Sequence, residues 1–199
     1  MNAPEKAGER ARKRILSAAK TCFAQRGFLA ASTRDIAEMA GVAQGLLRYH
    51  FDTKEALWRA VMDDIFAYMA SAYPIAEMEP ERTTRETLEV FIMDFITFSE
   101  DEPALYPLMT HESRSPSQRQ NWLLETHVRP YFEAVQSLLE EGQRERIVRH
   151  TDPVLLYYAI IGIVGAAYSY GPEISILRRG HSIQNKEKLR ALISDLIFI

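Results

Sequence analysis

The sequence predicts an all-α fold. Apolar residues recur with the helical period of about 3.6 in almost every segment. No segment alternates apolar and polar residues over the length of a strand with β-branched enrichment. Apolar residues make up 47% of the chain and charged residues 26%, which is ordinary for a globular protein and excludes a disordered or collagen-like chain.

Three helices are predicted in the first part of the chain. They are expected over residues 10–25, 33–40 and 43–51. Gly27 and Gly41 follow the first two helices as left-handed stops, and Ser32 and Asp35 have the spacing of a capping box. A short turn containing glycine between two short helices is the signature of a helix-turn-helix. In such a motif one helix braces on the DNA backbone and the other enters the major groove.

The rest of the chain also predicts helices. Asp52 is expected to cap a fourth helix, with Glu55 in the reciprocal capping position. Thr83 and Glu86 have the same spacing and are expected to open a fifth helix. Later helices are expected over residues 117–146, 153–170 and 185–198. Pro130 lies inside the first of these and predicts a kink, because proline removes a backbone hydrogen bond.

Charge is distributed unevenly along the chain. Residues 1–59 contain 11 Lys and Arg against 6 Asp and Glu, a balance of +5, whereas the remainder has 13 against 21, a balance of −8. The whole chain therefore carries the net charge of −3. A basic end on an acidic body indicates that this end meets a polyanion. The alternative is that the excess of positive charge in residues 1–59 is a chance feature of a solvated surface.

The chain is expected to be cytoplasmic. Cys22 is the only cysteine, so no internal disulfide can form, which is typical of a reducing compartment. Residues 153–170 carry no charge and reach the shortest length of a membrane-spanning helix. They contain four tyrosines, two glycines and a proline, and no basic cluster flanks them. We interpret this segment as a helix covered on all sides, with a second subunit as part of the cover and no membrane.

The exposed face expected for the third helix carries side chains that can read DNA. Gln44 can pair with adenine, Arg48 can pair with guanine, and Leu46 suits contact with a thymine methyl group. A second group of side chains is expected to contact DNA phosphates. Such contacts fix the register of the protein on DNA and carry no sequence choice. These residues are Thr33, Arg34, Tyr49, His50 and Lys54.

The stretch from residue 15 to residue 57 resembles the DNA-binding domain of the TetR family of regulators. The matching residues are Ile15, Ala18-Ala19, Phe23, Gly27-Phe28, Thr33, Ile36-Ala37, Ala40-Gly41-Val42, Gly45, Leu47, Tyr49-His50-Phe51 and Lys54-Glu55-Ala56-Leu57. The resemblance implies about nine helices, with DNA binding by the first three. It also implies a helix-turn-helix domain over residues 1–52 and a ligand-binding and dimerisation domain over residues 53–199. Beyond the first third, the chain agrees with the family only in its helical layout.

The resemblance assigns DNA-contact residues by position. They are Arg34, Gln44, Gly45, Leu46, Arg48, Tyr49, His50 and Lys54, with Thr33 capping the second helix against a phosphate. Arg48 departs from the family, which most often has a tyrosine there, and reaches either a base edge or a phosphate. His50 is either a DNA contact or an interface histidine between the third and fourth helices. Arg34 is either a phosphate contact or a solvated charge.

The C-terminal part is rich in aromatic residues, and ligand pockets between helices are lined in this way. The candidate pocket residues are Phe91, Asp94, Phe95, Phe98, Tyr106, Met109, His111, Tyr131 and Tyr158. The aromatic residues suit an ordinary core equally well. Asp94 and His111 are either groups that orient a ligand or surface residues. The spacing HExxH and clusters of cysteine are absent from the sequence, so no metal is expected.

A homodimer is expected from small residues in the apolar segment. Gly162, Gly165 and Ala166 permit close approach of helices, and the TetR resemblance implies a four-helix bundle formed with the last helix and a second subunit. The candidate interface residues are Leu155, Gly162, Gly165, Ala166, Leu189, Leu192, Ile193 and Leu196. Two-fold symmetry then places two reading helices about 34 Å apart and predicts a near-palindromic operator.

Together these features predict a transcriptional repressor that binds double-stranded operator DNA as a homodimer and is released by a small molecule whose identity the sequence does not give. The alternative is a regulator without a small-molecule inducer, which responds to a protein partner or activates transcription. The sequence has no GxSxG, Walker, GxGxxG or zinc signature. We therefore expect no enzyme activity, no catalytic residues and no cofactor.

Overall fold

The structure, a computed structural model, describes residues 3–75, 82–114, 116–179 and 185–199. Within these ranges the regular elements are helices, and one isolated bridge joins Val148 to Phe198. The predicted all-α fold is confirmed. The chain divides into two compact units, the first formed by Met1–Ala67 with Pro107–Leu124 and the second by Tyr68–Tyr106 with Glu125–Ile199. The predicted functional boundary at residue 52 stays a prediction.

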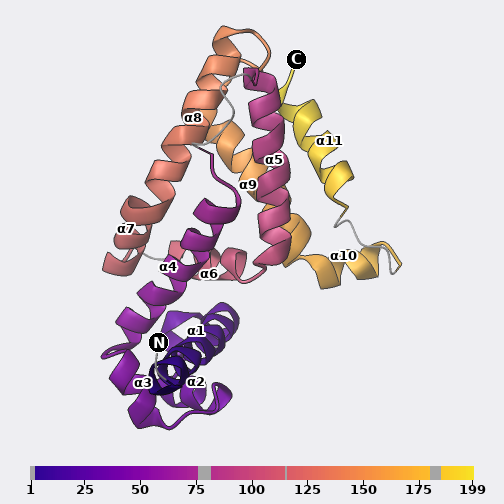
Figure 1. Ribbon diagram of the computed structural model, residues 1–199. Coiled ribbons are helices and arrows are strands. Elements are labelled where there is room, and N and C mark those ends of the chain that lie inside the picture. Colours follow the sequence, from indigo (N-terminus) through magenta and orange to yellow (C-terminus); the bar gives the residue numbers. More distant parts are fainter. Residues whose placement is uncertain (1–2, 76–81, 115, 180–184) are drawn as a thin grey trace. The chain divides into compact units, whose positions relative to one another are not determined.

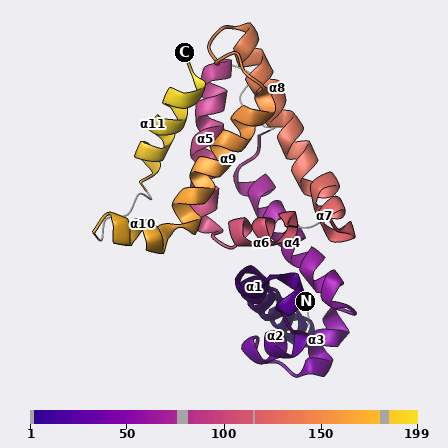
Figure 2. The same ribbon diagram turned by 180° about the vertical axis from the view of Figure 1, so that it is seen from behind.

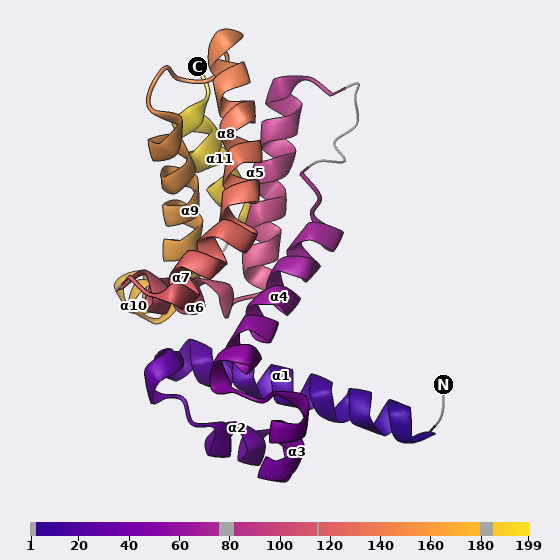
Figure 3. The same cartoon turned by 90° about the vertical axis from the view of Figure 1, so that its left-hand side faces the viewer.

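The first unit contains the three predicted N-terminal helices. These are α1 (Ala3–Ala30), α2 (Thr33–Met39) and α3 (Gln44–His50), followed by α4 (Lys54–Ala72), whose residues up to Ala67 belong here. In Figure 3, α1 runs across α2 and α3, and both pack against it. The buried side chains of Phe23, Ile36 and Leu47 come from α1, α2 and α3 in turn. Two later helices complete the unit, namely most of α6 (Leu105–Ser113) and all of α7 (Gln118–Leu123).

The second unit is a bundle built around α5 (Thr84–Asp101). Helix α5 packs against α8 (Arg129–Arg144), α9 (Pro153–Ser169) and α11 (Lys186–Ile197), and the two opposite views in Figures 1 and 2 show these four helices side by side. Helix α5 turns an apolar stripe inward. Its buried residues are Thr87, Leu88, Phe91, Ile92, Phe95, Ile96 and Phe98. The short α10 (Gly171–Leu177) follows α9 and was not predicted.

The regular α-helix is interrupted next to Pro130, and the bend predicted there stays a prediction. The single helix expected over residues 117–146 is divided into α7, a π-helical turn over Leu124–Val128, and α8. Pro130 lies in the first turn of α8 and has no N–H to donate to the preceding turn. The π-turn directly before it interrupts the regular hydrogen-bond ladder at the same point.

Two of the three predicted capping boxes are wrong. Ser32 does cap α2, but its hydroxyl accepts from the backbone N–H of Arg34, and the Asp35 carboxylate binds Arg26 of α1 at 2.5 Å instead. Helix α4 begins one residue later than expected. Its cap is the Thr53 hydroxyl, which accepts from the N–H of Ala56 at 2.9 Å.

The acidic residues of the other two predicted capping boxes have different outcomes. The side chain of Glu55, expected to complete the box with Asp52, pairs with Arg59 one turn along α4 at 2.7 Å. The box formed by Thr83 and Glu86 at the start of α5 is confirmed, with both reciprocal hydrogen bonds present.

In the described ranges, no helix combines the length and the apolarity that crossing a membrane requires.

Candidate nucleic-acid interface

The turn between α2 and α3 has the geometry that the sequence predicts. Gly41 adopts φ of +62°, a left-handed conformation that favours glycine, and its N–H donates to the carbonyl of Glu38. The N–H of Val42 then donates to the carbonyl of Ala37. These bonds close α2 and direct the chain into α3, so the two short helices form one rigid corner on α1.

Helix α3 turns nearly all of its side chains outward. Leu47 is its single buried residue, and it packs into the head, the group formed by α1, α2 and α3. Gln44, Leu46 and Arg48 are exposed, and the Tyr49 side chain is 81% exposed. A Cβ placed on Gly45 would meet no atom within 4 Å, so the backbone of α3 is bare at that point and open to close approach.

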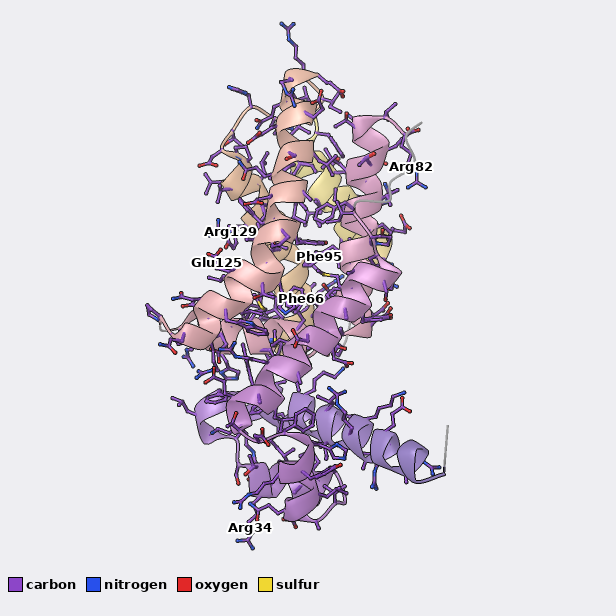
Figure 4. All side chains as sticks on the ribbon, turned by 60° about the vertical axis from the view of Figure 1, so that its left-hand side comes forward. Arg34, Phe66, Arg82, Phe95, Glu125 and Arg129 are labelled. Atoms are coloured by element: carbon purple, nitrogen blue, oxygen red, sulfur yellow. The ribbon has the colours of Figure 1, made fainter. Side chains whose placement is uncertain are left out.

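The predicted phosphate contacts on α2 lie on the same unit. Thr33 is half-buried at the first position of α2. Arg34 is exposed, and Figure 4 shows its side chain extending from the outer end of α2 into solvent. The ring of His50 lies edge-on to Tyr49, and its Nε2 atom is buried with no hydrogen-bond partner in the described part of the chain. Both alternatives for His50, a DNA contact and an interface histidine, stay predictions.

A polar surface hollow of about 490 Å³ brings three of the predicted contacts together. Thr33, Arg48 and Lys54 come from the start of α2, the end of α3 and the start of α4, and all three line it. Asp52 lies in the same lining and opposes the positive charge there. The hollow therefore brings one hydroxyl and two cationic side chains together from three separate elements.

Lys54 has a structural role that the sequence did not indicate. Its ammonium donates to the backbone carbonyls of Phe28, Leu29 and Ala31 at 2.9, 3.3 and 3.0 Å. An ammonium has three donors, so these bonds use its full capacity and cap the end of α1. The same nitrogen lies 4.5 Å from the centre of the Phe28 ring. The predicted phosphate contact by Lys54 stays a prediction beside this anchoring role.

Helices α6 and α7 hold the head through contacts that link residues far apart in the sequence. The Arg119 guanidinium of α7 lies 3.7 Å from the centre of the Phe28 ring, on a ring that Lys54 also contacts. Arg119 pairs with the buried Glu112 carboxylate of α6 at 3.3 Å. His111 packs against Gly27, whose φ is +71°. No local sequence signal pairs these residues, because each partner comes from a different helix.

The predicted pocket residues fall into both units. Phe91, Phe95 and Tyr131 lie together in the second unit, with ring centres 6.3 Å apart for the first two and 5.9 Å between Phe91 and Tyr131. Asp94 on the same helix is half-buried, and burial raises the pKa of its carboxyl above the ordinary value. Burial also raises the pKa of the Tyr131 hydroxyl.

The other predicted pocket residues lie elsewhere. Phe98 contacts the rings of Tyr68 and Tyr73, and the Tyr158 side chain is exposed. Tyr106 packs against Gly165. Met109 and His111 belong to the first unit. The aromatic cluster of Phe91, Phe95 and Tyr131 is therefore smaller than the predicted set.

The predicted dimer residues divide into an exposed and a buried group. Leu155 of α9 and Leu192 and Leu196 of α11 are exposed, and a Cβ on Gly162 would meet open space. Other members of the set serve the interior of the same chain, because α9 and α11 pack on each other and on α5. Leu189, Ile193 and Gly165 are buried within the chain, and Ala166 is half-buried. Only the exposed group presents a large apolar surface to a second chain.

Comparison with known proteins agrees with this geometry. A family model for bacterial regulatory proteins of the tetR family matches residues 15–61. The chain is 35% identical over 99 residues to the HTH-type transcriptional repressor KstR2 of Rhodococcus jostii (strain RHA1), a match that covers 48% of each chain. It is 26% identical over 198 residues to the HTH-type transcriptional dual regulator CecR of Shigella flexneri, covering 91% of this chain and 85% of that protein. The chain spans half or less of the length of the first curated relatives that it matches, 48% and 30%.

Solved structures share the fold over nearly the whole chain. HlyIIR, a hemolysin II transcriptional regulator, superposes with a TM-score of 0.75 at 22% identity and covers 95% of this chain and 98% of its own. AibR in complex with isovaleryl coenzyme A and operator DNA has a TM-score of 0.75 at 14% identity, covering 94% and 97%. Residues 15–61 therefore match the DNA-binding domain of bacterial regulatory proteins of the tetR family, and the chain as a whole shares the fold of these solved regulators.

Proposed function

We propose that the protein represses transcription by occupying operator DNA through α3. The observation that carries this proposal is the outward-facing set on α3, with one buried residue among seven. A helix this short gains little from its own hydrogen bonds, and its exposed Gln44, Arg48 and Tyr49 add nothing to the core. A DNA partner gives each of them a role. The major groove, about 12 Å wide, admits an α-helix and presents the base edges that Gln and Arg pair with.

The repressor acts as a symmetric homodimer. Exposed apolar side chains gather on α9 and α11, which pack against each other, and include Leu155, Leu192 and Leu196. Apolar helix faces of this kind are buried against the same faces of a second copy in a four-helix bundle. Two heads related by a two-fold axis then meet successive major grooves about 34 Å apart, which requires a near-palindromic operator.

Oligomeric state tests the dimer. The double variant Leu155→Glu with Leu192→Glu is expected to shift the mass measured by light scattering from two chains to one. Ile176→Glu is the matched control, because Ile176 is 80% exposed on α10 and lies outside this surface. A double variant that remains dimeric at the same concentration contradicts the proposed interface.

A small molecule releases the DNA. The aromatic cluster of Phe91, Phe95 and Tyr131 with the half-buried Asp94 supports a ligand site in the second unit, since apolar walls with a few polar groups are typical of such sites. The solved AibR complex contains both isovaleryl coenzyme A and operator DNA. The effector acts by binding better to a conformer in which α4 has shifted and the two heads no longer match the one-turn spacing.

Binding measurements test the function as a whole. DNA selected from a random pool is labelled, and its binding is followed by fluorescence anisotropy. Arg48→Ala is expected to weaken binding at least tenfold, whereas Lys188→Ala, on the surface of α11, is expected to leave it unchanged. Failure of the protein to select any sequence contradicts the proposal. A compound screen on the bound complex then separates release by a small molecule from a regulator that responds to a protein partner.

A further inference from the structure

The N-terminal half of α1 carries exposed positive charge beside the reading helix. Helix α1 begins at Ala3, well before Ile15, which is the first completely buried residue among those whose burial the structure describes. Figure 3 shows this half of α1 continuing past α3 toward the N-terminus. Arg12, Lys13 and Arg14 are all exposed there. The N-terminal half of α1 therefore contributes little to the buried core of the head.

The two arginines lie at opposite ends of α3. The guanidinium carbon of Arg12 lies 5.4 Å from the centre of the Phe51 ring, and Phe51 is the residue that ends α3. The Nη1 atom of Arg14 lies 3.7 Å from the point that a Cβ on Gly41 would occupy, in the turn that precedes α3. Helix α3 has seven residues and is thus about 10 Å long. One cation flanks each of its ends.

Ion pairing leaves both arginine charges available. Neither Arg12 nor Arg14 forms an ion pair with another residue in the described part of the chain. Lys13 differs, because it pairs with Glu9 at 3.6 Å and lines a hollow of about 210 Å³ together with Lys20 and residues of α4. Lys13 and Lys20 thus lie on the α4 side of α1, whereas Arg12 and Arg14 lie toward the ends of α3.

We propose that Arg12 and Arg14 bind the DNA phosphates that border the major groove entered by α3. This inference rests on the proposed function and adds a backbone contact from α1 to it. The sugar–phosphate strands border the groove that α3 enters. The planar guanidinium matches the phosphate oxygens and binds them in a bidentate manner. Such contacts raise affinity and fix the register of α3, and they carry no sequence choice.

The salt dependence of binding measures these contacts directly. The logarithm of the binding constant falls with the logarithm of salt concentration by about 0.9 for each phosphate contact, so losing one contact per subunit flattens the slope of a dimer by about 1.8. We expect this change for Arg12→Gln and for Arg14→Gln, on the selected operator and on unrelated duplex DNA alike. Lys20→Gln, which removes a charge on the α4 side of α1, is expected to keep the wild-type slope.

The outcomes separate this inference from the function on which it rests. A wild-type protein that binds DNA with a steep slope, together with arginine variants whose slopes match that of Lys20→Gln, overturns the phosphate contacts and leaves the repressor intact. A wild-type protein that binds no duplex at low salt overturns both.

A structural role for Arg12 is distinguished by Arg12→Lys. Lysine keeps the charge and loses the planar fork over Phe51, so this variant is expected to retain the wild-type salt slope. Thermal unfolding of each variant shows whether the head is folded. Because Arg14 lies on the exposed surface of α1, Arg14→Gln tests the inference even if Arg12→Gln unfolds. A slope unchanged in folded Arg14→Gln overturns its assignment.

Discussion

The ion pair between Arg119 and Glu112 makes a sharp prediction about how the first unit is held together. The Nη2 atom of Arg119 lies 3.3 Å from the Glu112 carboxylate, and the two side chains are 18% and 5% exposed. The guanidinium also covers the Phe28 ring at 3.7 Å. Since both charges are largely removed from water, deleting one leaves the other without its counter-charge. Arg119→Met keeps most of the apolar volume and removes only the cation.

The expected cost follows from this burial. Removing one partner of a buried pair costs about 3–5 kcal/mol, and the residual exposure of Arg119 places it at the lower end of that range. Loss of the contact with the Phe28 ring adds about 1 kcal/mol. A total of about 4 kcal/mol lowers the Tm of a chain of this size by roughly 8–16 °C. The hydroxyl of Ser117, at 3.5 Å, is too distant from the Glu112 carboxylate to replace the cation.

Tryptophan fluorescence follows unfolding of this unit specifically. The chain has two tryptophans, Trp58 and Trp122, and both lie in the first unit with ring centres 5.9 Å apart. Arg129→Met is the matched control, because it breaks an exposed pair between Arg129 of α8 and Glu125 of the π-helical turn and is expected to leave the Tm within error. The double variant Arg119→Met with Glu112→Gln strands no charge and is expected to recover part of the loss. An Arg119→Met variant as stable as the control refutes the reasoning.

Three further predictions follow from single contacts. Gly165→Ala places a Cβ 1.7 Å from the Tyr106 ring and is expected to destabilise the protein by about 1–3 kcal/mol in calorimetry. In the control variant Gly162→Ala the new Cβ meets open space, so this variant is expected to keep or raise the Tm. Equal effects of the two substitutions contradict this packing. Lys54→Met removes three hydrogen bonds to backbone carbonyls at and just after the end of α1 and is expected to cost about 2–3 kcal/mol in urea unfolding. An unchanged midpoint refutes the anchoring role. Burial raises the pKa of Asp94 in the folded protein, so its ionisation lowers stability as pH rises from the ordinary carboxyl pKa through the raised one. Asp94→Asn is therefore expected to gain stability over the wild type at pH 7 and to lose that gain below the ordinary pKa; a gain independent of pH contradicts it.

Local patterns predicted the head of the protein well. The periodic apolar residues and Gly41 predicted α2, α3 and the turn between them, because helix period and left-handed glycine act within a few residues. The site of the helix interruption next to Pro130 was indicated for the same reason. The capping residues were harder to assign. Asp52 and Thr53 are adjacent candidates, and one residue of offset in the entering chain decides which oxygen reaches the N–H of Ala56.

Contacts between distant segments were not predictable from one sequence. The pair of Arg119 with Glu112 and the three bonds of Lys54 join helices whose meeting is set by tertiary packing. Burial of individual residues on α9 and α11 is decided in the same way, since helical periodicity alone left open which leucines α5 would cover. Leu189 and Leu192 are three positions apart, and one is buried while the other is exposed.

The central claim is that α3 reads base edges twice, from a symmetric pair of subunits. Sequences selected from a random DNA pool by the wild type and by Gln44→Ala test it most directly. The account predicts two half-sites related by a two-fold axis, with centres about one helical turn apart, and a base preference lost at one symmetric position in the Gln44→Ala selection. Identical selected sequences for the two proteins, or a single half-site without symmetry, would contradict it.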